Sequence, residues 1–140
     1  MDYDMVGPAL ALGLSATGSS IGCGIAGMTT HAVMARVEEG HGKFIGMAAA
    51  PSSQVIYGFI LMLLMARAIE EKTLAPGSGI GIGLCAGVAM MFSAIYQGKV
   101  CSTGIQASAK KPAIFGKCFA AVGIVESFAL FAFVFSLLIM

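Results

Sequence analysis

The chain has 140 residues, of which 58% are apolar and only 11% are charged. Its mean hydropathy is +0.91, and a soluble domain of this size would need many more polar side chains to cover its surface. The 8 basic and 7 acidic residues nearly balance, so nothing indicates a nucleic-acid footprint, and the apolar content excludes a disordered chain. The composition therefore predicts an integral membrane protein.

The charged residues form clusters that are separated by long uncharged stretches, and after Lys117 the only charge is Glu126. A membrane span needs about 20 predominantly apolar residues, and lipid forces each span to be helical. Short connections make consecutive helices antiparallel, so we expect a single all-α membrane domain over 1–140, built from two tandem hairpins at 6–69 and 77–140. The four predicted helices cover 6–36, 43–69, 77–110 and 112–140.

We expect no cleavable signal at the start of the chain, because Asp2 and Asp4 stand where a basic segment would be needed. The orientation follows from the basic residues, since these favour the cytoplasmic side. Two of them, Arg67 and Lys72, mark the second connection. The others cluster at the first and third connections, which should therefore be cytoplasmic, with both termini outside: Arg36, Lys43, Lys99, Lys110, Lys111 and Lys117.

The two hairpins resemble each other in sequence. The segment Ser19–Gly24 aligns with Ser93–Gly98 at an offset of 74 residues, and in the second helix of each hairpin Gln54 stands opposite Glu126. Two apolar helices align partly by chance, but the pattern is typical of an internal duplication.

Small residues recur every fourth position in the first and third helices. Such stripes let helices approach closely in lipid. They can pack the two helices together within one chain, or pack many copies into a narrow ring, which we favour because both helices carry a stripe. The glycines concerned are Gly18, Gly22, Gly79, Gly83 and Gly87. We expect the second and fourth helices to face lipid with bulky residues such as Phe59, Leu61, Leu63, Leu64, Phe128, Phe131, Phe133 and Phe135.

Glu126 lies half-way along the fourth predicted helix, between apolar neighbours. A charge at the bilayer centre costs at least about 2.5–3.5 kcal/mol. Lys99 and Lys117 lie nearer the helix ends, so Glu126 must take up a proton or a metal cation. The alternative is a carboxyl that stays protonated and hydrogen-bonded within the bundle.

Other oxygen atoms can converge on this carboxylate. The second helix carries Ser53, Gln54 and Tyr57, and Pro51 should free backbone carbonyls over 47–50 through a kink. Gln97 and Ser127 add further oxygens. An all-oxygen site of net charge near −1 suits a monovalent cation such as Na+, whereas a proton site needs little beyond the carboxyl. Taken singly, each polar residue can equally be a helix–helix hydrogen bond.

The combination of several segments resembles the proteolipid family of V-type and archaeal-type rotary ATPases, which form the rotor ring. These segments are Pro51–Gly58 (PSSQVIYG), Gln97–Val100 (QGKV), Gly104–Gln106 (GIQ), Lys110–Pro112 (KKP) and Val125–Ser127 (VES). The resemblance implies a non-catalytic membrane ring of identical subunits, which turns against a stator subunit that supplies an arginine. It also implies central-stalk subunits at the cytoplasmic loops, ATP hydrolysis or synthesis in a separate soluble head, and a bacterial or archaeal cell membrane.

The same resemblance implies a sodium site. Its ligands would be Glu126, Gln54, Gln97, Ser53, Tyr57 and the Ala50 carbonyl, with Ser53 in place of an expected threonine. Two glutamines favour Na+ over H+ as the coupling ion, and one carboxylate serves four helices. Less favoured classes are a small multidrug exporter, which would carry its acid in the first helix, and a structural pore, which would not need these polar residues at one depth.

Overall fold

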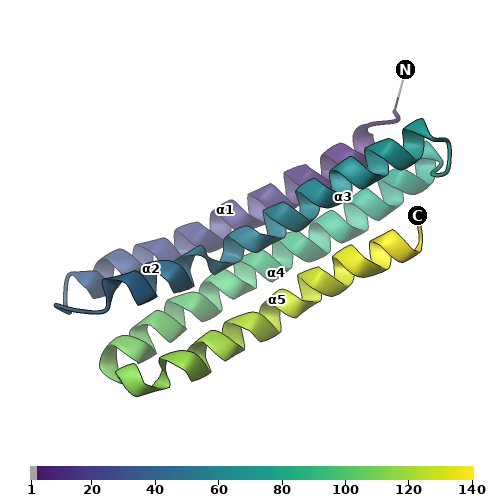
Figure 1. The fold of residues 1–140 in the computed structure, drawn as a ribbon. Helices are drawn as coiled ribbons and strands as arrows, with labels where there is room; N and C mark the ends of the chain where they lie inside the picture. The colour runs from purple at the N-terminus through teal and green to yellow at the C-terminus, as the bar shows by residue number, and fades with distance from the viewer. Residues whose placement is uncertain (1–2) are drawn as a thin grey trace.

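A computed structural model describes residues 3–140 and contains only helices and their connections in that range; Asp2 lies outside the described residues. Four segments are long and apolar enough to cross a membrane. The fold is therefore an all-α membrane protein of two tandem hairpins (Figure 1). Its elements are α1 (Val6–Met34), α2 (His41–Ala49), η1 (Ala50–Ser52), α3 (Ser53–Glu70), α4 (Pro76–Lys110), η2 (Pro112–Ile114) and α5 (Phe115–Leu138).

The spans differ from the sequence prediction mainly at their ends. The first helix ends at Met34 rather than at residue 36, since Arg36 already donates its N–H to the Val33 carbonyl in a tighter turn. The second span begins at His41 rather than 43 and is broken at Pro51 into α2, the 3-10 turn η1 and α3. Proline has no N–H and its ring displaces the preceding turn, so a break is the expected result there.

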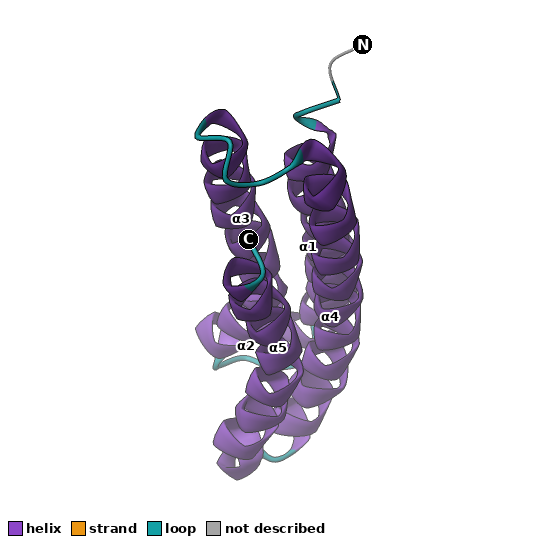
Figure 2. Ribbon diagram, turned by 90° about the vertical axis from the view of Figure 1, so that its right-hand side faces the viewer, coloured by secondary structure: helices purple, strands orange, loops and turns teal. Residues whose placement is uncertain are grey.

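The helices form two layers, with α1 beside α4 in one and α3 beside α5 in the other (Figure 2). Within each hairpin, a serine of the first layer reaches the backbone of the second. Ser19 accepts a hydrogen bond from the Val55 N–H at 3.0 Å, and Ser93 donates one to the Val125 carbonyl at 2.9 Å. These serines are 74 residues apart, so the duplication is visible in the packing as well as in the sequence.

The glycine stripes lie between α1 and α4 of the same chain. A Cβ at Gly18 would overlap the Met91 backbone, and one at Gly22 would overlap the Ala94 carbonyl. Gly83 lies in the same way against Gly7, and Gly87 against Leu10 and Leu14. A Cβ at Gly79 would meet only side-chain atoms, although the Gly79 backbone is what a Cβ at Gly7 would overlap. The stripes therefore serve packing within one chain, which corrects our use of them as an argument for packing between copies.

Replacement of Gly22 by leucine should destabilise the bundle, because the obstructing atom is a backbone carbonyl that cannot rotate away. Overpacking of this kind costs about 1–3 kcal/mol or more in the free energy of unfolding. Denaturant titration of the detergent-solubilised protein measures the loss. Gly46→Leu is the matched control, because nothing lies within 4 Å of a Cβ at Gly46; equal stability of the two variants would contradict the packing.

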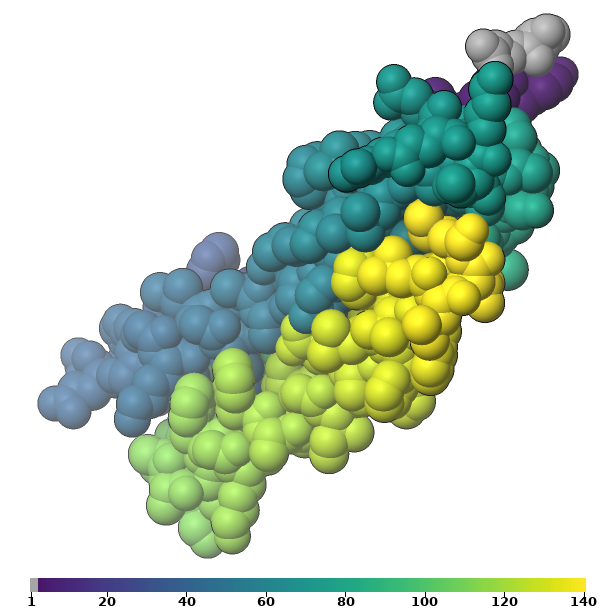
Figure 3. Space-filling model, turned by 45° about the vertical axis from the view of Figure 1, so that its right-hand side comes forward, coloured from purple at the N-terminus to yellow at the C-terminus, as the bar shows by residue number. Residues whose placement is uncertain are grey.

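Figure 3 shows the teal α3 and the yellow α5 on one face of the molecule. Much of their bulky apolar surface is exposed, as expected for a face in lipid. The exposed side chains are Phe59, Leu63, Phe128, Phe131 and Phe135. Leu64 is also exposed, but only by a small margin. Leu61 is an exception: it is fully buried in a cluster with Ala11 and Met65, because it shares the inward face of α3 with Gly58. Phe133 is also partly buried, since its ring stacks on Tyr57 with centroids 6.0 Å apart.

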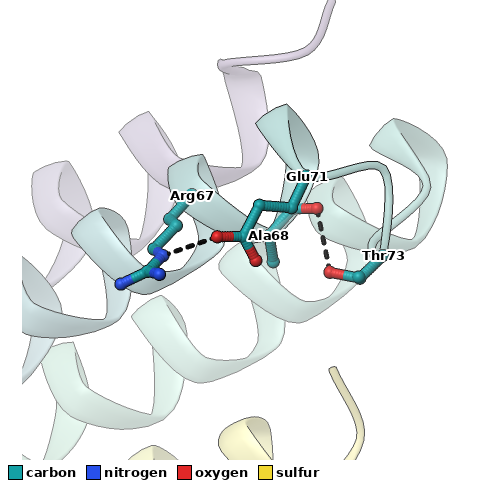
Figure 4. Close-up of polar contacts among 4 residues, drawn as sticks. All are labelled: Arg67, Ala68, Glu71 and Thr73. Carbon is teal, nitrogen blue, oxygen red and sulfur yellow. Dashed lines mark hydrogen bonds and ion pairs between the residues drawn. The ribbon is translucent and has the colours of Figure 1, made fainter.

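The first and third connections lie together at one end of the bundle, and the second lies at the other end near both termini (Figure 1). At the second connection Arg67 and Glu71 form an ion pair at 2.8 Å, and the Thr73 hydroxyl donates to the Ala68 carbonyl at 3.0 Å (Figure 4). Lys72 has a positive φ of 60° there. Tight connections at both ends keep the polar side chains of α3, α4 and α5 in a fixed register.

Candidate ion-binding site

Glu126 is half-buried in the middle of α5, and its carboxylate accepts hydrogen bonds from two helices. The Tyr57 hydroxyl of α3 donates to Oε1 at 2.8 Å, and the Gln97 amide of α4 donates to Oε2 at 3.4 Å. Among residues 3–140, no lysine or arginine forms an ion pair with Glu126. The carboxylate is therefore oriented by neutral donors, and its charge has no basic partner in the described chain.

Gln54 and Gln97 are fully buried and bonded to each other. The Gln54 Nε2 donates to the Gln97 Oε1 at 2.8 Å, and the Gln97 Nε2 also lies 3.2 Å from the Val122 carbonyl. Buried amides are costly unless they are paired. One hydrogen bond joins the two glutamines, and the Gln97 amide group donates onward to Val122 and Glu126.

Ser53 and Ala50 extend the network toward the break in the second span. The Ser53 hydroxyl lies 3.3 Å from the Gln54 Oε1 and 3.1 Å from the Ala50 carbonyl. The 3-10 turn at η1 brings that carbonyl within reach of the hydroxyl, but the carbonyl also accepts the Ser53 backbone N–H, so the break at Pro51 does not leave it free as we expected. The Ser53 hydroxyl has one proton and donates to only one of these two oxygens at a time, whereas the bonds from Gln54 through Gln97 to Glu126 and Tyr57 form a continuous network.

Two serines behave differently from the expectation based on sequence. Ser127 bonds to the Ile124 carbonyl of its own helix at 2.7 Å and takes no part in the network. Ser93, which we did not predict, is buried and joins it: the Gln54 Nε2 lies 3.4 Å from its hydroxyl. Its position one helical turn before Gln97 was the signal available in the sequence.

The network contains oxygens of six side chains and one backbone carbonyl, and it has a single formal negative charge, on Glu126. Hard cations are bound by carboxylate, carbonyl and hydroxyl oxygens of this kind. A proton on Glu126 would need only the carboxyl, so the additional oxygens fit a cation better than they fit a simple proton carrier.

The sequence model of the ATP synthase C-subunit family matches the chain twice, at residues 6–65 and 80–139. The A-type ATP synthase subunit K of Methanocaldococcus jannaschii is 35% identical over 135 residues, which cover 96% of this chain. The chain spans only 60% of the length of that relative. The V-type sodium ATPase subunit K of Enterococcus hirae is 33% identical over 143 residues, covering 99% of this chain and 90% of the relative.

Proposed function

The chain belongs to the ATP synthase C-subunit family, and from that premise we propose that it is a rotor-ring subunit of a V-type or archaeal-type rotary ATPase that carries Na+ on Glu126. It has no catalytic residue of its own in this proposal; ATP is hydrolysed or made in a separate soluble head. The two hairpins carry one ion-binding carboxylate between them. The observation that carries the proposal is the continuous hydrogen-bonded network of amide and hydroxyl groups that ends on the Glu126 carboxylate.

The choice of Na+ rests on the parts of the site that a proton does not need. Gln54, Gln97, Ser53 and the Ala50 carbonyl add oxygen atoms that lie in one network with the carboxylate. The name of the Enterococcus hirae relative, a sodium ATPase subunit at 33% identity, points the same way. Protons would compete with Na+ at low pH, because either ion neutralises the same carboxylate.

Transport follows from neutralisation. An ionised carboxylate facing lipid costs at least about 2.5–3.5 kcal/mol, and a bound cation removes that cost. A protomer that holds its ion can therefore turn through the lipid, while an empty one must stay beside a polar stator surface. In our proposal a stator arginine pairs with Glu126 there and displaces the ion, so ion passage is coupled to rotation of a ring of identical protomers.

The orientation is part of the proposal. The first and third connections, which carry most of the basic residues, lie at the same end of the bundle (Figure 1). By the preference of basic loops for the cytoplasmic side, this end faces the cytoplasm and both termini face outside. The central-stalk subunits would then dock on the loops at 35–40 and at Lys111.

Carbodiimide labelling of Glu126 tests the proposal directly, because the reagent attacks a protonated carboxyl and a bound Na+ excludes the proton. In membranes at a fixed pH, millimolar Na+ should protect Glu126 from labelling, and the same concentration of K+ should not. Labelling that follows pH alone and ignores Na+ would make this a proton rotor. An absence of labelling at every pH would remove Glu126 from the mechanism.

A further inference from the structure

Ser93 lies on α4 where that helix meets both the helix of the carboxylate and the second span. Its side chain is buried, with 7% of the residue exposed. The Ser93 hydroxyl donates to the Val125 carbonyl of α5 at 2.9 Å, and its oxygen accepts a hydrogen bond from the Gln54 Nε2 of α3 at 3.4 Å. Because Val125 directly precedes Glu126, one hydroxyl joins the backbone beside the carboxylate to an amide on the far side of the network.

The two hydrogen bonds of Ser93 fix which end of the Gln54 amide faces it. A hydroxyl has one proton to donate and lone pairs with which it accepts. The Val125 carbonyl can only accept, so it takes the Ser93 proton and leaves the lone pairs toward Gln54. Gln54 must therefore turn its NH2 group to Ser93, because its oxygen would face another oxygen with no proton between them.

Gln97 imposes the same orientation from its own side. Its NH2 group lies 3.2 Å from the Val122 carbonyl and 3.4 Å from the Glu126 Oε2, and a carbonyl and an ionised carboxylate both only accept. Gln97 thus turns its Oε1 to Gln54, which donates to it at 2.8 Å. Both hydrogen atoms of the Gln54 NH2 group are therefore used, one on Gln97 and one on Ser93.

The consequence for the site is the direction of the Gln54 oxygen. Gln54 Oε1 lies 3.3 Å from the Ser53 hydroxyl, which can turn instead to the Ala50 carbonyl at 3.1 Å. Oε1 is then free to bind a hard cation, as amide oxygens do. With the amide reversed, the NH2 group would stand at this place, and its positively polarised hydrogens would repel Na+.

We propose that Ser93 is a positioning residue of the sodium site, which holds the Gln54 amide with its oxygen toward the ion. The inference rests on the proposed function and adds a residue that need not touch the ion. Ser19, the repeat counterpart 74 residues earlier, accepts the Val55 N–H at 3.0 Å. Among residues 3–140 it forms no hydrogen bond with Gln54 or Gln97, so only the serine of the second hairpin orients an amide of the site.

Protection of Glu126 from carbodiimide by Na+, measured in membranes, tests the inference on Ser93→Ala. This variant loses one of the two groups that hold the Gln54 amide. The Na+ concentration for half-protection should rise about tenfold, the lower end of the range for groups that support a metal ligand. The pH dependence of labelling without Na+ should stay unchanged, because Tyr57 and Gln97 still contact the carboxylate. An unchanged Na+ requirement, or a pH dependence that moves with it, would overturn the inference.

Ser19→Ala is the matched control. Ser19 is buried to the same degree, with 5% exposed against 7% for Ser93, and its hydroxyl oxygen also joins two helices. The control therefore removes the same atom from the equivalent place in the other hairpin. Its Na+ requirement should equal that of the unmodified protein. An equal loss in both variants would mean that weaker helix packing is the cause, and Ser93 would have no positioning role.

The double variant Ser93→Ala, Gln54→Leu shows whether Ser93 acts through Gln54. Once the amide is absent, the alanine should add no further loss of Na+ protection beyond that of Gln54→Leu alone. A role of Ser93 in packing α4 on α5 would instead weaken protection by the same factor in both backgrounds. A second tenfold loss in the double variant would therefore count against the inference.

The unmodified protein separates the two proposals. If Na+ protects it and the Ser93 variant at the same concentration, the positioning role is wrong and the proposed function stands. If Na+ does not protect the unmodified protein at all, the sodium assignment fails, and the positioning role falls with it.

Discussion

Replacement of Glu126 by glutamine is expected to reduce Na+ transport and coupled ATP turnover to background while the ring stays assembled. The amide has nearly the shape of the carboxyl, and its oxygen can still accept a hydrogen bond from the Tyr57 hydroxyl, although its NH2 group cannot accept the bond that Oε2 takes from Gln97. It carries no charge, however, so it neither attracts Na+ nor pairs with a stator arginine. Because the site is permanently neutral, the variant removes the alternation between loaded and empty states on which coupling depends.

The measurement is ATP-driven 22Na+ uptake into vesicles that contain the whole complex, with ring assembly checked on the same preparation. Glu71→Gln is the matched control, since Glu71 is an exposed carboxylate whose ion pair with Arg67 lies far from the site in the chain. Its transport should equal that of the unmodified protein. Normal uptake by the Glu126 variant would show that the carrier is another group.

The membrane spans were predictable because they depend only on where charged residues fall along the sequence. A charge costs so much in lipid that long stretches with few or no charges mark the four helices, and the proline at 51 marks the break in the second. The depth of Glu126 relative to Gln54 and Gln97 follows from counting residues along antiparallel helices. The structure brings these three side chains into one hydrogen-bonded network.

What could not be predicted depends on rotation of the helices about their axes. The glycines at 18 and 22 indicate close approach, but the partner helix is decided only when the bundle is assembled. The same applies to the serines: a hydroxyl can bond to its own helix, as in Ser127, or reach another helix, as in Ser93. Both residues are serines within a membrane helix, and what differs is whether a carbonyl of another helix lies within reach of the hydroxyl.

The geometry also distinguishes the groups that contact Glu126 directly from those that reach it only through another side chain. Tyr57 and Gln97 contact the carboxylate directly, whereas Gln54 bonds to Gln97 and Ser53. A proton on Glu126 depends on the first pair alone. A cation that also uses the oxygens of the second span depends on Gln54, so this residue separates the two coupling ions.

Replacement of Gln54 by leucine should therefore weaken Na+ binding by about 10–100-fold, the range found when supporting groups around a metal site are removed. The change removes one oxygen and leaves the buried Gln97 Oε1 without its donor. Glu126 and Tyr57 remain in contact, so the carboxyl can still take up a proton. Protection of Glu126 from carbodiimide should need correspondingly more Na+, and labelling should then follow pH over the range of Na+ concentrations that protects the unmodified protein.

Gln106→Leu is the control for the loss of an amide from the membrane domain, because Gln106 is exposed on α4 and takes no part in the network. Titration of labelling against Na+ at two fixed pH values gives both apparent affinities. Unchanged protection in the Gln54 variant would mean that the ion is held without the second span. The glutamine pair would then be a helix–helix hydrogen bond, and the argument for Na+ over H+ would lose its structural basis.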